Sequence, residues 1–109
     1  MLTGASRGIG HATVKRFAAA GWRVITCSRH PVDAACPWPM AEEDHVQVHL
    51  GDPKATMAAA AEIRRCLDGK LDALVNNAGI SPKGPEGGRL NSIETDLRDW
   101  GKVFHVNFF

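Results

Sequence analysis

Three glycines near the amino terminus are spaced as a phosphate-binding loop would space them. Gly4, Gly8 and Gly10 form the pattern G-x-x-x-G-x-G between a short apolar stub and a run of helical character. Glycine allows φ angles above zero and lets the backbone approach a ligand that a Cβ atom would hold away. The free N–H groups of the first helical turn would then face a bound anion. The spacing predicts a phosphate or pyrophosphate site, although a plain glycine-rich turn would also fit.

This loop matches neither the G-x-G-x-x-G fingerprint nor a P-loop, so a second feature has to decide its role. That feature is the segment Asn76-Asn77-Ala78-Gly79, which directly follows the apolar run 71–75. The two motifs together resemble the short-chain dehydrogenase/reductase family, in which T-G-x-x-x-G-x-G precedes N-N-A-G. The resemblance extends over nearly the whole chain. It implies an oxidoreductase that moves hydride between a nicotinamide dinucleotide and an alcohol or carbonyl substrate.

The resemblance also implies which residues bind the cofactor. The glycine loop would line the path of the phosphates, and Thr3 would tie that loop to its neighbours. Asp52 would hydrogen-bond the adenine edge while it also caps a helix. The N-N-A-G segment would pass the adenosine ribose, with Asn76 as its more structural member. The residues expected to bind the cofactor are Gly4, Ser6, Arg7, Gly8, Ile9, Gly10, Ser28, Arg29, Asp52, Asn77, Ala78 and Gly79.

The end of the second predicted strand indicates which nicotinamide cofactor binds. An acidic residue usually stands there and bonds the ribose 2′-hydroxyl of NAD, whereas this chain has Ser28. Arg29 follows directly, and Arg7 stands in the glycine loop. In the family, basic residues at these two places are associated with NADP, whose 2′-phosphate pairs with guanidinium groups. We therefore expect NADP rather than NAD, although both arginines would also be ordinary as solvated surface charges.

Asn107 is the residue of this chain that we expect to take part in catalysis. It shares or borders the apolar stripe of the last predicted helix, so a polar partner should meet it. By resemblance it holds a water molecule in the family's proton relay, and a helix–helix hydrogen bond is the alternative. The family's catalytic Ser and its Tyr-x-x-x-Lys pair lie downstream, and this chain contains no tyrosine. We therefore expect the 109 residues alone to be inactive.

Hydrophobic patterning predicts the strands and the fold class. Short apolar runs at 23–27, 45–50 and 71–75 are typical of strands, and residues 11–20 have helical spacing. This alternation indicates an α/β fold, a Rossmann-type doubly wound parallel sheet. The 109 residues are too few for the complete fold. We expect residues 1–109 to form a partial dinucleotide-binding domain, an N-terminal βαβαβ half plus a following helix, truncated at the C-terminus and at the first strand.

Capping residues predict where the helices begin and end. Gly21 should end the first helix, and Asp52 with Pro53 should begin a second that continues to about Leu67. A third helix should begin near Thr95 or Asp96. The expected inner stripe of the second helix is Thr56, Ala60, Ile63 and Leu67.

The segment 28–44 contains three prolines around Trp38, which disfavour a regular helix over the whole span. We expect it to cover an edge of the sheet, and a functional loop is the alternative. No metal site is expected, because the spacing of the candidate ligands matches no known pattern. Those candidates are His30, Cys36, His45 and His49.

Composition restricts the partners and the compartment. The net charge is +1, from 13 basic and 12 acidic residues, so nothing favours nucleic acid or a membrane surface. No apolar run approaches the ~20 residues of a membrane span. Three cysteines without a C-x-x-C pair favour a reducing cytoplasm. The expected partners are a small alcohol or carbonyl substrate and, for the full-length protein, further copies of itself in a dimer or tetramer.

Two other interpretations remain open at the level of sequence. The chain could be a dinucleotide-binding module without chemistry, such as a redox sensor. It could also be a truncated product that has no stable fold. A Tyr-x-x-x-Lys pair in the remaining chain would argue against the first, and a cofactor-dependent thermal melt against the second.

Overall fold

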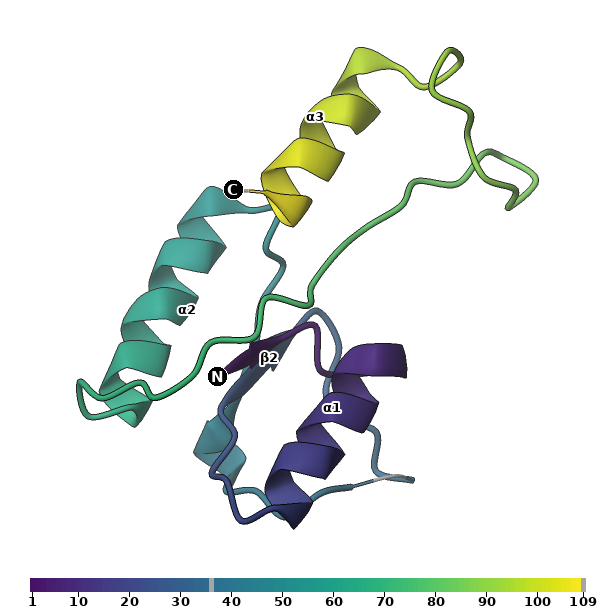
Figure 1. The fold of residues 1–109 in the computed structure, drawn as a ribbon. Coiled ribbons are helices and arrows are strands. Elements are labelled where there is room, and N and C mark those ends of the chain that lie inside the picture. Colours follow the sequence, from purple (N-terminus) through teal and green to yellow (C-terminus); the bar gives the residue numbers. More distant parts are fainter. Residues whose placement is uncertain (36, 109) are drawn as a thin grey trace. The chain divides into compact units, whose positions relative to one another are not determined.

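The computed structural model of the chain describes residues 1–35 and 37–108. It divides into two compact units, Met1–Ala78 and Gly79–Phe109. The glycine loop, the sheet and two helices belong to the first unit, and the third helix belongs to the second. Figure 1 colours the chain from purple at the N-terminus to yellow at the C-terminus and labels some of these elements.

The first unit is built on a parallel sheet. Its strands are β1 (Leu2–Thr3), β2 (Thr26–Ser28) and β3 (His45–Gln47), in the spatial order β1-β2-β3. A single parallel bridge between Leu2 and Val75 adds the run 71–75 on the free side of β1. The resulting order is that of one half of a doubly wound sheet, so the predicted fold class is confirmed.

The strands are shorter than the sequence predicts. The run 71–75 makes only that bridge, because β1 offers two residues for pairing. β2 begins at Thr26 rather than at Arg23, and β3 ends at Gln47 rather than at Leu50. Apolar patterning marks residues that are buried, whereas a strand extends only as far as its neighbour pairs with it.

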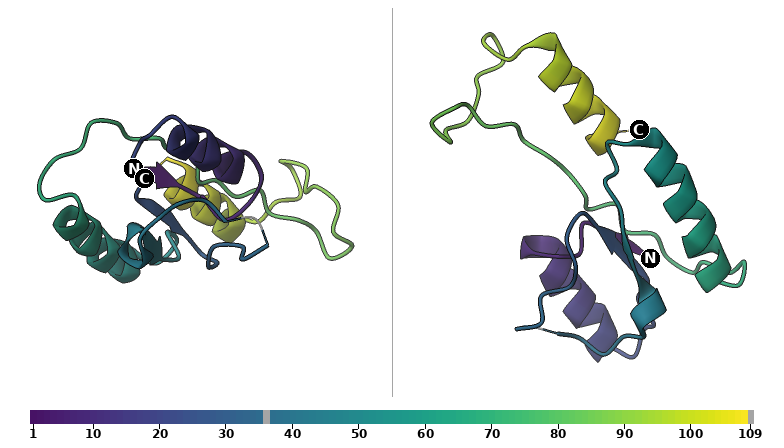
Figure 2. Two further views of the ribbon diagram at one scale, coloured as in Figure 1. Left: turned by 90° about the horizontal axis from the view of Figure 1, so that it is seen from below. Right: turned by 180° about the vertical axis from the view of Figure 1, so that it is seen from behind.

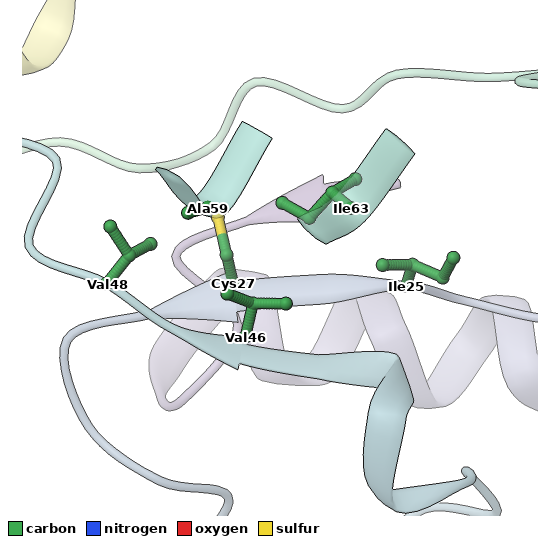
Figure 3. Close-up of a cluster of buried hydrophobic side chains, with 6 residues drawn as sticks. All are labelled: Ile25, Cys27, Val46, Val48, Ala59 and Ile63. Carbon is green, nitrogen blue, oxygen red and sulfur yellow. The ribbon is translucent and has the colours of Figure 1, made fainter. Parts of the chain in front are cut away.

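Two helices pack on opposite faces of this sheet, as Figures 1 and 2 show. They are α1 (Gly8–Ala19) and α2 (Pro53–Cys66). Alternate side chains of β2 point to opposite faces, so Cys27 faces α2 and Thr26 faces away from it. Figure 3 shows the core on the α2 side, which consists of Ile25, Cys27, Val46, Val48, Ala59 and Ile63.

The helix ends mostly agree with the capping signals. The Asp52 carboxylate accepts hydrogen bonds from the N–H groups of Lys54 and Ala55, at 2.9 and 3.1 Å, and Pro53 is the first helical residue. Gly21 has φ 84°, as expected for a residue that ends a helix. Of the predicted inner stripe of α2, Ile63 is buried and Thr56 and Leu67 are half-buried, but Ala60 is exposed and Ala59 is buried in its place.

α1 begins at Gly8, three residues before the predicted start at His11. Gly10 already belongs to the helix, and only Gly4 and Gly8 within the loop have φ above zero. The sequence motif therefore extends into the first turn of α1.

The segment between β2 and β3 contributes to the core instead of only covering the sheet edge. Trp38 is 5% exposed and packs with Leu2, Ala5 and Val14 on the α1 side. The His11 ring meets it edge to face, with 5.3 Å between ring centroids. The segment ends in a short 3₁₀ turn, η1 (Glu42–Asp44). Within residues 1–35 and 37–108 no three His, Cys, Asp or Glu side chains are grouped to hold a metal; Cys36 lies outside these ranges.

An ion pair fastens η1 to the chain that precedes β2. The Arg23 guanidinium donates to the Asp44 carboxylate at 2.7 Å from Nη2 and 3.0 Å from Nε. Its third contact is to the carbonyl oxygen of Cys66, at 3.2 Å, near the end of α2. The Asp44 carboxylate is 5% exposed, and its hydrogen bonds raise the pKa of Arg23. One arginine thus links three segments of the first unit.

We predict that Arg23→Ala lowers the stability of the protein more than Arg98→Ala does. The first change leaves a buried carboxylate without its partner, whereas the Arg98 side chain is 89% exposed in a looser pair with Asp96. Urea unfolding monitored by circular dichroism measures both. Equal unfolding midpoints for the two variants would show that the buried ion pair contributes no more to stability than the exposed one.

The second unit contains α3 (Leu97–Asn107), which begins where the sequence predicts. Asp96 caps it by accepting from the N–H groups of Arg98 and Asp99, at 2.6 and 3.2 Å. Along α3, Trp100, Phe104 and Phe108 stack in succession. In the part of the chain that the structure describes, no helix has the length and apolar composition needed to cross a lipid bilayer.

Candidate cofactor-binding site

The glycine loop is a close-packed turn at the carboxyl end of β1. The N–H groups of Gly4 and Ala5 donate to the carbonyl oxygen of Cys27, at 2.8 and 3.4 Å. A Cβ atom on Gly10 would collide with the Gly4 carbonyl oxygen, and one on Gly4 would lie 2.9 Å from the Cα atom of Ala78. Two of the three motif glycines are thus required by the packing of the loop itself.

Gly8 is required for a different reason. Its φ angle is 58°, but a Cβ atom added there meets no atom within 4 Å. The loop is therefore open on the side of Gly8 and closed on the side of Gly10. Space for a ligand against the loop therefore lies beside Gly8 and not beside Gly10.

The N-N-A-G segment holds the loop in place, so the structure brings together the two motifs that the sequence paired. The Asn77 side chain donates to the carbonyl oxygens of Thr3 and Gly4, at 3.0 and 3.2 Å. In return, the Thr3 hydroxyl oxygen accepts from the N–H groups of Asn77 and Ala78, at 3.0 and 2.9 Å. The predicted role of Thr3 as a tie is confirmed.

The choice of Asn76 as the structural member of that segment is wrong. Asn76 is exposed, whereas Asn77 makes the bonds to the loop. Successive residues of an extended chain point in opposite directions, so only one of the two amides can face the loop. The sequence places two asparagines side by side and gives no sign of which one faces inward.

The N-terminus of α1 is available to an anion. Its cap residue Arg7 has an extended backbone, and no described side chain bonds the free N–H groups of the first turn. The first turn also contains no acidic residue. The side chains of Arg7 and Ile9 are exposed, and Ser6 is half-buried. Unbonded N–H groups and the positive end of the helix dipole favour a phosphate at this position.

The end of β2 presents one buried and one exposed polar side chain. Ser28 is 5% exposed, and its hydroxyl donates to the carbonyl oxygen of His30 at 2.6 Å. Arg29 is exposed. The neighbouring Cys27 is buried on the α2 side, and this burial raises the pKa of its thiol. At this strand end, therefore, the exposed charge belongs to Arg29 and no carboxylate accompanies it.

Asn107 meets a polar partner in the second unit, as the sequence predicts, but the partner is not another helix. Its side-chain oxygen accepts from the N–H group of Ile80 at 2.8 Å, and its amide nitrogen donates to the Ile80 carbonyl at 3.1 Å. A Cβ atom on Gly79 would lie 3.6 Å from the same side-chain oxygen. The helix–helix alternative is therefore wrong, because Asn107 holds the backbone just beyond the N-N-A-G motif.

The whole chain, residues 1–109, matches the short chain dehydrogenase family. The chain belongs to this family. Protein FixR from Bradyrhizobium diazoefficiens is 53% identical over 109 residues, which cover 98% of this chain and 39% of that protein. Among solved structures, an oxidoreductase of the short chain dehydrogenase/reductase family from Brucella ovis, in complex with a partially ordered NAD, has a TM-score of 0.88 at 64% identity, over 98% of this chain and 49% of that one.

A NADPH-bound carbonyl reductase from chicken fatty liver is a more distant neighbour. Its TM-score is 0.73 at 28% identity, over 98% of this chain and 44% of that one. The chain thus spans less than half the length of each of these three proteins. The comparisons cover the part of each protein that corresponds to the glycine loop and the N-N-A-G segment of this chain.

Sequence reasoning missed two hydrogen-bond partners, one in each unit of the chain. The carbonyl oxygen of Cys27 anchors the glycine loop, and the backbone of Ile80 receives Asn107. Both partners are main-chain groups, which every residue type provides. Residue identity therefore carries no signal for them, and only the folded backbone brings them within hydrogen-bond distance.

We predict that Gly10→Ala destabilises this short chain dehydrogenase more than Gly8→Ala does. Alanine at position 8 has to adopt a left-handed backbone, which costs about 1–2 kcal/mol, but finds open space. Alanine at position 10 suits the helix yet collides with the Gly4 carbonyl, so the loop and Asn77 must move. Thermal unfolding of both variants measures the difference, and a smaller loss for Gly10→Ala would contradict this account.

Proposed function

We propose that this chain is the NADP-binding portion of an oxidoreductase that transfers hydride between nicotinamide and an alcohol or carbonyl group. The observation that carries the proposal is the uncapped N-terminus of α1 behind a glycine loop that Asn77 braces. In such an enzyme the bound nicotinamide supplies or accepts the hydride. Residues of this chain would hold the phosphates on the first-turn N–H groups and keep the loop rigid.

The choice of NADP rests on the end of β2. Arg29 is exposed there, and Arg7 is exposed at the N-terminus of α1. No carboxylate occupies the strand end, where an NAD-binding chain would use one for the ribose 2′-hydroxyl. Guanidinium groups bind phosphate through charge-assisted, often bidentate hydrogen bonds. The relatives include one solved with NAD and one with NADPH, so the cofactor has to be decided by this chain's own residues.

We expect the full-length protein to bind NADPH more tightly than NADH, and Arg29→Asp to narrow or invert that ratio. The aspartate removes a cation from the 2′-phosphate and provides an acceptor for a 2′-hydroxyl. Fluorescence titration with the two dinucleotides measures the ratio. Arg98→Asp is the matched control, since it makes the same change of charge on α3. Equal affinities in the wild type, or a ratio that Arg29→Asp leaves unchanged, would refute the assignment.

We further propose that Asn107 serves a proton relay by holding a water molecule. Its side chain makes two hydrogen bonds with the Ile80 backbone, so it fixes the backbone on which such a relay would depend. The amide keeps one further N–H group and one oxygen lone pair with which it would hold the water. The acid–base residues of the relay, the family's Ser, Tyr and Lys, lie beyond this chain. The 109 residues alone therefore provide a cofactor site without turnover.

In the full-length protein, Asn107→Ala should lower turnover far more than it lowers cofactor affinity. A positioned acid–base group contributes roughly 10²–10⁴-fold to the rate. Steady-state kinetics and cofactor titration separate the two effects, and Lys102→Ala on the same helix is the control. A variant that merely melts earlier, with turnover intact, would leave Asn107 with a packing role only.

The remaining partners follow from the family. We propose a small alcohol or carbonyl substrate, the cytoplasm as compartment, and a homo-oligomer of the full-length protein. Large apolar side chains are exposed along α3, as an interface between copies would use them. These are Leu97, Trp100, Phe104 and Phe108.

A further inference from the structure

Three consecutive carbonyl groups at the end of β2 are each bonded by β3 or by the residue directly after it. The Ser28 carbonyl accepts from the N–H group of Val48 at 2.9 Å. The Arg29 carbonyl accepts from the side-chain amide of Gln47, also at 2.9 Å. The His30 carbonyl lies 3.2 Å from Nε2 of His45. The carbonyl group of every residue in the segment 28–30, which contains Arg29, is thus hydrogen-bonded to β3 or to Val48.

The partners of His45 determine which of its nitrogens carries the proton. A carbonyl oxygen can only accept, so Nε2 must be the donor toward His30. Nδ1 lies 2.8 Å from the hydroxyl oxygen of Thr26, whose single proton can go to Nδ1 or to the Asp44 carbonyl oxygen, 3.2 Å away. Burial lowers the pKa of His45, in agreement with a neutral ring that donates from one nitrogen and accepts at the other. The ring therefore bridges β2 and the turn beyond it.

The Ser28 hydroxyl completes the arrangement. It donates to the His30 carbonyl at 2.6 Å and lies 3.3 Å from Nε2 of His45. Its single proton is therefore used inside the protein. Within this turn, Arg29 is the charged side chain that remains exposed beside the backbone so held.

We propose that His45 and Gln47 are positioning residues that set the preference for NADP, because they fix the backbone from which Arg29 reaches the 2′-phosphate. This inference rests on the proposed function, in which Arg29 binds that phosphate. A backbone that is already fixed lowers the conformational entropy that is lost when a guanidinium group makes a bidentate contact with phosphate. Neither residue needs to touch the cofactor, and both act through the Arg29 and His30 carbonyls.

The test uses four single variants, of which three change one of the hydrogen bonds to this turn and the fourth removes Arg29. Gln47→Leu keeps the approximate size of the side chain but removes the donor to Arg29. His45→Asn is too short to reach the His30 carbonyl, whereas His45→Gln is long enough to donate to it in place of Nε2. Arg29→Ala removes the proposed phosphate ligand itself. Each variant is made in the full-length protein, and its melting temperature is recorded so that folding is known.

Titration with NADPH and NADH should show a selective effect. Gln47→Leu and His45→Asn should each weaken NADPH binding about threefold to tenfold, the value of one lost hydrogen bond, and leave NADH binding nearly unchanged. His45→Gln should retain the wild-type ratio of NADPH affinity to NADH affinity. In the Arg29→Ala background, Gln47→Leu should change the ratio no further, because the group it positions is gone.

Three results would overturn the inference, and they are distinguishable. If Arg29→Ala lowers the ratio of NADPH affinity to NADH affinity but Gln47→Leu and His45→Asn do not, Arg29 binds the phosphate and β3 does not position it. The inference fails in the same way if those two variants weaken both dinucleotides equally, since that is the effect of a structural role. If Arg29→Ala itself leaves the ratio unchanged, the proposed choice of NADP fails, and the inference fails with it.

Discussion

The structure of the candidate site depends on the close approach of two backbone segments that only glycine permits. Gly10 lies so near the carbonyl of Gly4 that a methyl group would not fit. This close contact allows the chain to pass from β1 into α1 through a short, tight turn. The Asn77 amide bonds the carbonyls of Thr3 and Gly4 on the same loop. A steric constraint and a pair of hydrogen bonds therefore act on the same few backbone atoms. Their combined effect is a helix N-terminus whose position is fixed before any ligand arrives.

β3 has a comparable role at the other end of the proposed cofactor site. It is three residues long, and its buried residue Val46 packs on the α2 side. The residues on either side of Val46 point to the opposite face, where His45 and Gln47 bond the turn after β2. One short strand thus closes part of the core with one face and holds the Arg29 backbone with the other. The alternation of side chains along a strand makes both roles possible.

The sequence predicts the parts of this fold that rest on residue type. Asp52 and Asp96 begin their helices as predicted, because a carboxylate that accepts backbone N–H groups is a local interaction. The length of β3 and the inner face of α2 are predicted less well, since pairing and packing are decided by neighbours distant in sequence. Asn76 and Asn77 illustrate the limit for the site. Their types are identical, and only the direction of the folded chain distinguishes them.

The three helix N-termini of the described chain differ in a way that bears on function. α2 and α3 each begin with an aspartate whose carboxylate bonds the first N–H groups and offsets the helix dipole. The residue before α1 is Arg7, a cation, and no described side chain caps the first N–H groups of this helix. A cation at that position adds to the positive potential instead of neutralising it, which is unfavourable for an isolated helix. In the proposed complex a bound phosphate would remove this unfavourable term, so the stability given up at this helix end would be regained as affinity for the anion.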